Sequence, residues 1–193
     1  MNPDAMSEIL LRYLQSARSA VLWKLEGLSE YEVRRPLTAT GTNLLGVVKH
    51  LAGVEHEYLS SCFGRAMVFP APWEGDDSPN VDMWATAEES RELVVERYRM
   101  AWRADDAAVR ELGLDARGTV PWWGEDGKDV TMFRVLVHVL AETSQHAGQM
   151  DILRESVDGA AGLSKGWSNL PDFTAQDWAA HVARLEEVAA GFR

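Results

Sequence analysis

The feature that most constrains the fold is the stretch TMFRVLVHVLAETSQHAGQMDILRE at residues 131–155. Its first half is apolar enough for a buried strand, but apolar residues continue at helical spacing through Met150 and Leu153, which predicts one long helix. On a helix of 3.6 residues per turn, its main polar side chains share one stripe about 100° wide. These side chains are His138, Glu142, Gln145, His146 and Gln149. Polar groups on an otherwise apolar helix need partners, so we expect a polar site along this stripe.

Glu142 and His146 stand four residues apart, so their side chains meet on one face of the helix. A carboxylate and an imidazole placed in this way can hold one divalent metal ion. Two ligands are too few for a tight site. His50 borders the apolar stripe of another predicted helix, which is long enough to pack against the central one. The sequence therefore predicts a metal site of His50, Glu142 and His146, and the alternative is a set of buried polar residues joined by hydrogen bonds.

The composition limits the partners and the compartment. A formal charge of −11 and a pI near 4.9, without a cluster of Lys or Arg, disfavour nucleic acid and anionic membrane surfaces. No apolar stretch approaches the roughly 18 residues of a transmembrane helix. Cys62 is the single cysteine, and the N-terminal segment MNPDAMSEIL lacks the basic and apolar parts of a signal peptide. We therefore expect a cytoplasmic protein without an intramolecular disulfide.

The length of 193 residues predicts one domain spanning residues 1–193. Apolar residues at three-and-four spacing predict helices at about residues 5–26, 44–63, 86–112, 131–155 and 174–190. The connections 64–85 and 113–129 are long, and the second could contain a short extended pair. The predicted fold is all-α: a four-helix bundle with long inter-helix loops and a short C-terminal fifth helix.

Local signals set the expected helix ends. Gly27 is placed to end the first helix, whose charged side chains, Arg18 among them, lie off its apolar stripe. Thr42 or Asn43 could cap the second helix. The capping-box pattern that begins at Thr86 predicts the start of the third.

Other chemically active side chains have plainer interpretations. His138 lies one turn before Glu142 and is expected to support a ligand or to be a hydrogen-bonded core residue. His56 and His181 are expected on the surface or in packing, and Glu57 in a pocket wall or a salt bridge. Cys62 lies about three turns beyond the predicted ligand of its helix, which favours a buried structural thiol over a nucleophile.

Several of the eight tryptophans fall in predicted loops, where large aromatic side chains are less usual. They could cover a pocket or could simply pack within their loops. Among them are Trp73, Trp122, Trp123 and Trp167.

The phrases NLLGVVKHLAGVEHEYL at residues 43–59 and HVLAETSQHAGQMDILRE at residues 138–155 resemble the DinB/YfiT-like family of metal-binding four-helix bundles. Many members carry a histidine at the position of Glu142. The His, Glu, His set is similar to that of mycothiol-dependent maleylpyruvate isomerase, in which such residues hold zinc for a thiol cofactor. That isomerase has an additional C-terminal domain, whereas about 35 residues follow the fourth helix here, so its particular reaction is not carried over.

The resemblance implies a divalent metal, with zinc first and nickel, iron or manganese as other ions, together with mycothiol or the related thiol bacillithiol. It implies a metal-dependent thiol transferase or thiol-dependent isomerase that acts on a small electrophilic molecule held by loop aromatics. One alternative is a metal-dependent hydrolase that uses metal-bound water. Another is a non-catalytic metal-binding stress protein that forms a homodimer through an exposed helix face.

Overall fold

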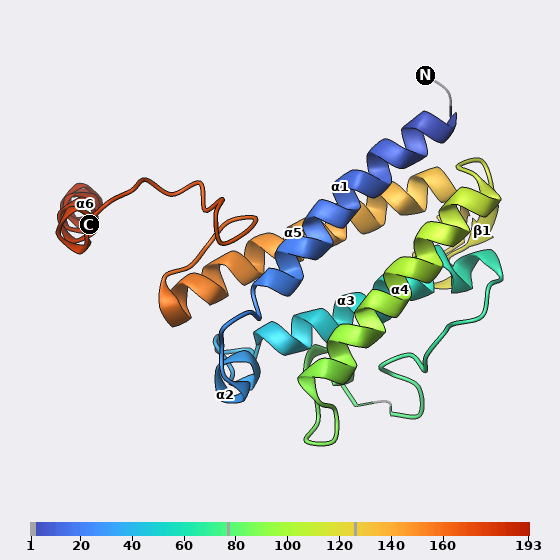
Figure 1. Cartoon of the computed structure of the whole chain (residues 1–193), viewed down its shortest axis with the longest axis horizontal. Helices are drawn as coiled ribbons and strands as arrows, with labels where there is room; N and C mark the ends of the chain where they lie inside the picture. The colour runs from blue at the N-terminus through green and yellow to red at the C-terminus, as the bar shows by residue number, and fades with distance from the viewer. Residues whose placement is uncertain (1–2, 77, 126) are drawn as a thin grey trace.

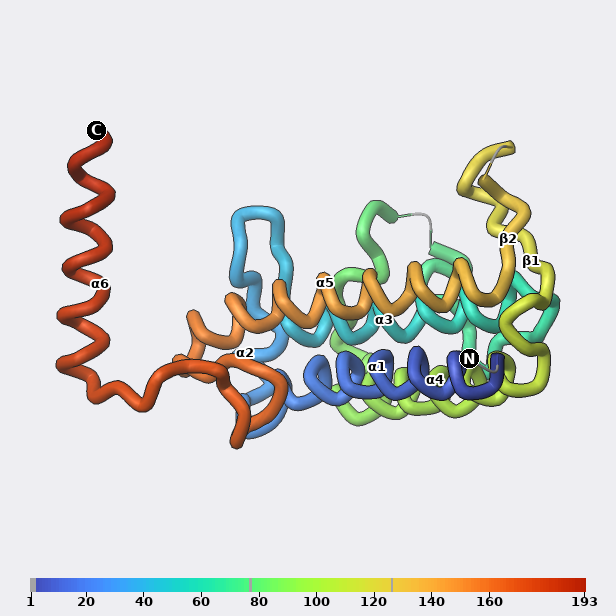
Figure 2. Tube along the Cα trace, turned by 90° about the horizontal axis from the view of Figure 1, so that it is seen from above, coloured from blue at the N-terminus to red at the C-terminus, as the bar shows by residue number. Residues whose placement is uncertain are grey.

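The computed structural model describes residues 3–76, 78–125 and 127–193 and contains a bundle of four long helices in two layers. Figures 1 and 2 show α3 and α5 side by side in one layer and α1 and α4 in the other. Helix α5 packs against both α1 and α3, and α3 packs against α4. The long helices are α1 (Pro3–Trp23), α3 (Leu44–Leu59), α4 (Arg91–Leu112) and α5 (Met132–Asp158). The predicted all-α bundle is confirmed.

The apolar stripes of these helices meet in two neighbouring clusters of buried residues. Leu51 and Met150 lie in the first cluster, whereas Leu14 and Leu136 lie in the second. At the start of α3, the Asn43 side chain accepts a hydrogen bond from the backbone of Gly46, so one of the two predicted caps is confirmed. This core fixes α3 beside α5, and their shared outer face carries the predicted ligands.

Short elements stand at the ends of the long helices. The expected extended pair is present: β1 (Arg117–Thr119) pairs antiparallel with β2 (Asp129–Thr131). Helix α2 was not predicted, although Ser29 and Glu32 form its capping box. Short helical segments lie in the connections between the long helices. The short helical elements are α2 (Glu30–Arg34), η1 (Ser61–Phe63), η2 (Val81–Met83) and η3 (Pro121–Trp123).

The predicted start of α4 was wrong. The helix begins at Arg91, and Ser90 caps it by accepting a hydrogen bond from the backbone of Leu93. The Glu89 carboxylate does accept a bond from the backbone of Thr86, as in a capping box, but it also pairs with Lys49 on α3. That contact to α3 fixes residues 86–89 as a turn rather than as the first turn of the helix.

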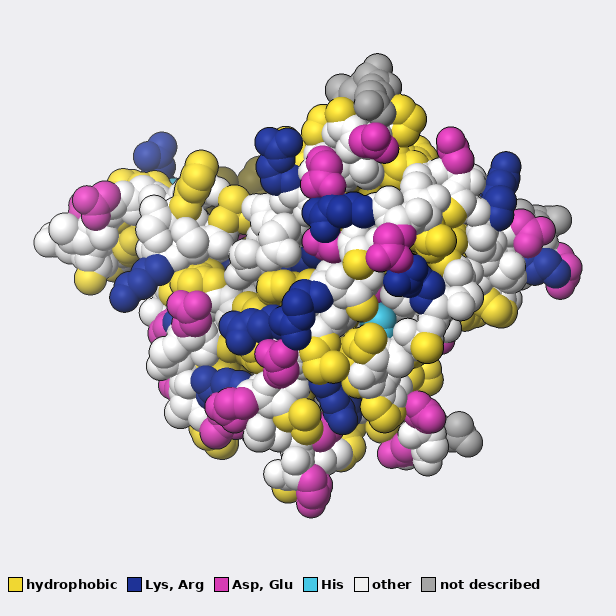
Figure 3. Space-filling view, turned by 45° about the vertical axis from the view of Figure 1, so that its right-hand side comes forward, with side chains coloured by type: hydrophobic (Ala, Val, Ile, Leu, Met, Phe, Trp, Pro, Cys, Tyr) yellow, Lys and Arg dark blue, Asp and Glu magenta, His cyan; other side chains and the backbone are white. Residues whose placement is uncertain are grey.

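The predicted C-terminal helix is present as α6 (Ala175–Ala190), where Thr174 and Asp177 form a capping box, and it stands away from the bundle (Figures 1 and 2). All of its residues are exposed except Trp178, which is partly buried. One domain over residues 1–193 therefore stays a prediction, and so does a homodimer. In the described part of the chain, every helix is too short or too polar to cross a lipid bilayer. On the face drawn in Figure 3, acidic and basic side chains are interspersed.

The bundle interior contains buried charged side chains that the sequence did not predict. Arg18, expected off the buried stripe, is fully buried and donates two hydrogen bonds to Glu55 Oε1, at 3.0 and 2.6 Å. His56 is also fully buried: its Nε2 accepts from the backbone of Val68, so its Nδ1 carries the proton and donates to Asp105 at 2.7 Å. Periodicity placed Arg18 correctly relative to the apolar residues, but it could not show that another helix covers this side.

Burial raises the pKa of the Glu55 carboxyl to about 7, although Arg18 acts in the opposite direction. The pKa of an unfolded glutamate is about 4.3, so between these values the folded protein holds one proton more than the unfolded chain. The free energy of unfolding should therefore fall as pH rises through this window, by at most about 1.4 kcal/mol per pH unit from this group. Urea unfolding at several pH values should show that slope, and Glu55→Gln should flatten it. An unchanged slope in the variant would assign the dependence to other groups.

Candidate metal centre

The structure brings the three predicted ligands together at the joint face of α3 and α5. Among the described residues, His50, Glu142 and His146 form a group whose ligand atoms all lie within 4.8 Å of one another. The two imidazole rings meet edge to face, with centroids 4.9 Å apart. Glu142 Oε1 lies 3.2 Å from His146 Nε2 and 3.8 Å from His50 Nε2. Three donor atoms from two helices therefore face one point.

Both histidines are held in orientation by their second ring nitrogen. His50 Nδ1 lies 2.6 Å from Asp82 Oδ2, and His146 Nδ1 lies 2.8 Å from Gln149 Oε1. A carboxylate or an amide oxygen can only accept here, so each Nδ1 carries the proton. In the neutral ring, Nε2 then presents a lone pair to the shared point. Such outer partners fix the tautomer of metal-binding histidines in general.

The electrostatics of the triad favour a bound cation. Burial lowers the pKa of His146 below its ordinary value and the nearby His50 lowers it further, although Glu142 acts in the opposite direction. With the proton on Nδ1, the neutral His146 ring directs the lone pair of its Nε2 toward the Glu142 carboxylate. A positive charge between these groups would stabilise them. This chemistry favours a metal centre over three residues linked by hydrogen bonds.

The spacing also fits a metal ion. Ligand atoms about 2.1 Å from a tetrahedral zinc ion are about 3.4 Å apart, and the Glu142 distances of 3.2 and 3.8 Å lie on either side of that value. The side chains of His50, Glu142 and His146 are 17, 30 and 12% exposed, so a small molecule can reach them. Three protein ligands with an accessible fourth position are typical of catalytic zinc.

Asp82 should matter for the metal although it is not one of the three. Replacing it by alanine frees the His50 ring to rotate, and loss of such a partner typically lowers metal affinity about 10- to 100-fold. Glu74→Ala removes one exposed negative charge from the same connection and is the matched control. Competition with a chromophoric chelator measures both. Equal affinities for the two variants would mean that Asp82 does not orient His50.

A cluster of aromatic side chains lies one helical turn from Glu142, toward the start of α5. Trp122 and Trp123 in η3 each donate an indole N–H to Tyr58 Oη at 2.9 Å. The His138 ring lies edge to face against Tyr58 and Trp123, with both centroid distances 4.9 Å. His138 is therefore packed among aromatic rings, and the side chains that support the predicted ligands are Asp82 and Gln149.

The other singled-out residues lie outside the triad. Cys62 is half-buried rather than fully buried, and burial raises the pKa of its thiol to about 12; its structural role stays a prediction. Glu57 is half-buried, and within the described residues it forms no hydrogen bond or ion pair; burial raises its pKa. His181 is exposed on α6, as predicted. Trp73 packs near Gly53, whereas Trp167 is exposed in the loop after α5, so Trp167 does not cover the triad.

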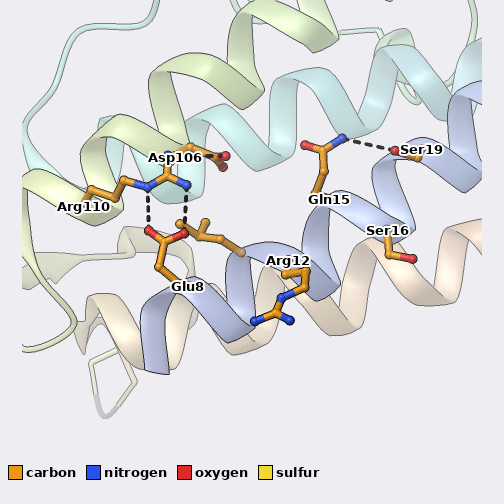
Figure 4. A pocket seen from close by; sticks show the side chains of 8 residues that line it. Glu8, Arg12, Gln15, Ser16, Ser19, Asp106 and Arg110 are labelled. Carbon is orange, nitrogen blue, oxygen red and sulfur yellow. Dashed lines mark hydrogen bonds and ion pairs between the residues drawn. The ribbon is translucent and has the colours of Figure 1, made fainter. Parts of the chain in front are cut away.

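A groove of about 570 Å³ runs between α1 and α4 in the opposite layer of the bundle (Figure 4). Its charged groups other than Arg12 are already paired: Arg110 donates to Glu8 (Figure 4), and Asp106 accepts from Arg18. Paired charges on an open surface are typical of a solvated groove. The triad on α3 and α5 therefore remains the candidate for chemistry.

A four-helix bundle with a His, Glu, His set on one face defines the class: the DinB/YfiT-like superfamily of metal-binding helical proteins. Within it, the chain belongs to the mycothiol-S-transferase family, whose sequence model matches residues 9–159, from α1 to the end of α5. A comparison with curated proteins gave no match. The predicted superfamily is confirmed, and the family makes this protein a transferase with mycothiol as the implied co-substrate.

Proposed function

We propose that this protein transfers mycothiol to a small electrophilic molecule at a zinc ion held by His50, Glu142 and His146. The observation that carries this proposal is the fixed orientation of both imidazoles, which directs two lone pairs and a carboxylate to one point. Family membership supports thiol transfer over the hydrolase and the non-catalytic alternatives.

The residues of the chain would act by binding and orienting. When bound, the ion supplies a Lewis acid that lowers the pKa of a neighbouring thiol, so that mycothiol is a nucleophile at neutral pH. The three ligands leave room for that thiol on their exposed side. The thiol proton passes to solvent when the thiolate forms. The new sulfur–carbon bond then forms as the bond from that carbon to its leaving group breaks, and the group departs with the bonding electron pair.

The aromatic end of the site would hold the acceptor. Trp122 is 49% exposed, and its N–H bond to the buried Tyr58 holds the indole in place. A fixed, half-exposed indole offers an apolar surface to a small electrophile. Tyr58 lies two turns beyond His50 on α3, which leaves space for a small molecule between the aromatic end and the triad.

Cobalt substitution tests the proposal. Adding mycothiol to the cobalt-loaded protein should produce a sulfur-to-metal charge-transfer band, because only directly bound sulfur gives one. The same preparation should join mycothiol to monobromobimane, an electrophile that becomes fluorescent when it reacts with a thiol. If thiols leave the spectrum unchanged while an ester is hydrolysed in a metal-dependent way, the hydrolase alternative replaces the transferase.

A further inference from the structure

A pocket of about 400 Å³ opens beside the segment that orients His50. This volume lies within the range of about 300–1,000 Å³ that is typical of small-molecule sites. The lining residues are all uncharged and combine hydroxyl, amide, thioether and indole side chains with backbone. They are Thr40, Gly41, Thr42, Asn80, Met83 and Trp84.

The pocket adjoins the triad through η2. In the sequence, Asp82 stands between the lining residues Asn80 and Met83, and its carboxylate accepts a hydrogen bond from His50. Gly46, one turn before His50 on α3, allows this approach, because a Cβ atom there would lie 1.8 Å from the Met83 carbonyl oxygen. One turn of α3, about 5.4 Å of helix, therefore separates the Met83 contact from the first predicted ligand.

The pocket wall is preorganised by buried polar contacts. Lys49 Nζ donates to the backbone oxygens of Val81 and Trp84 at 3.0 and 3.1 Å, and the Asn43 amide donates to Met83 O at 3.3 Å. These bonds fix the backbone of Trp84, while its side chain stays 48% exposed. A half-exposed indole on a fixed backbone can stack on the apolar face of a sugar ring at little entropic cost.

We propose that this pocket binds the sugar and polyol body of the thiol co-substrate, with its sulfur at the triad; this inference rests on the proposed function. Mycothiol joins N-acetylcysteine through an amide to glucosaminyl-inositol, which is neutral and rich in hydroxyl groups. Uncharged hydroxyl and amide side chains next to an indole match that chemistry. Bacillithiol instead ends in a malate carboxylate, which would require a cation, and Lys49 nearby already pairs with Glu89. The uncharged lining therefore fits mycothiol better than bacillithiol.

Kinetics with two thiols separate this inference from the transferase itself. In Trp84→Ala, the KM for mycothiol should rise about tenfold with kcat nearly unchanged, because a stacking contact is lost from binding alone. The KM for N-acetylcysteine, which lacks the sugars, should not change.

Trp167→Ala is the control: it removes another exposed loop tryptophan and should leave both KM values as in the wild type. Thr40→Val, which removes a single hydroxyl, should raise the mycothiol KM less, and this milder variant serves if Trp84→Ala does not fold.

Direct binding gives a second readout. Glucosaminyl-inositol without the cysteine should receive saturation from the protein in saturation-transfer NMR, and the signal should disappear in Trp84→Ala and persist in Trp167→Ala. Equal mycothiol KM values in wild type and Trp84→Ala would overturn the pocket assignment and leave the transferase intact. Failure of every thiol to react would overturn the proposed function, whereas glucosaminyl-inositol binding would then still support the pocket.

Discussion

Replacing His146 by alanine should abolish both metal binding and thiol transfer. Helix α5 supplies two of the three predicted ligands, and the variant would retain only His50 and Glu142, which is too few for a tight site. The purified variant should contain little metal by elemental analysis and should lose the cobalt charge-transfer band. Thiol transfer to monobromobimane should fall to the uncatalysed rate.

Two controls make this result specific. His181→Ala removes a histidine from the exposed α6 and should leave metal content and activity unchanged. Chelation of the wild type should lower the melting temperature but leave a helical spectrum, because the two apolar clusters form without the site. A His146→Ala protein with one tightly bound metal ion would show that the triad is not the metal centre.

The helical core was predictable because its signals are local. The apolar spacing of α5 and the Asn43 cap of α3 depend on residues within a few positions in the sequence. Helix α4 shows where local signals fail. The pattern at Thr86 is as good a capping box as the one at Thr174, but Glu89 forms a salt bridge with Lys49, 40 residues earlier, and the helix begins later.

The candidate site was predictable where it depends on helical spacing and on helix packing. Glu142 and His146 are close in space because of helical spacing alone, and His50 joins them because α3 packs beside α5. Asp82 comes from an irregular connection that carries no periodic signal, so no pattern could place it on His50. Sequence spacing left His138 as either a supporting or a core residue, and it could not show that η3 brings Trp123 against its ring.

Arg18 shows a different limit of sequence periodicity. A residue off the apolar stripe is exposed only if no other helix covers that side, and here α3 and α4 contribute Glu55 and Asp106 to it. The Arg18 guanidinium also lies over the Trp102 ring, 5.6 Å from its centroid. These partners are 37 or more residues away in the chain. Only the packed structure identifies the ion pair as part of the interior.

Arg18→Met should destabilise the fold by about 3–5 kcal/mol near pH 8, because it leaves the buried Glu55 carboxylate without its cation. Arg12→Met, on the exposed side of the same helix, is the matched control and should cost less than about 0.5 kcal/mol. Urea unfolding of all three proteins measures the difference.

The loss should depend on pH in a defined direction. Burial raises the pKa of Glu55 to about 7 with Arg18 present, and since Arg18 lowers that value, its removal raises it further. Below about pH 7 both folded proteins bury a neutral carboxyl, so the gap between wild type and Arg18→Met should shrink as pH falls from 8 to about 7 and change little at lower pH. A second variant, Arg18→Met with Glu55→Met, should regain most of the lost stability at pH 8, because apolar side chains of similar volume can replace a buried pair. A pH-independent loss that the double substitution does not relieve would instead mean that Arg18 stabilises the bundle through its packing against Trp102.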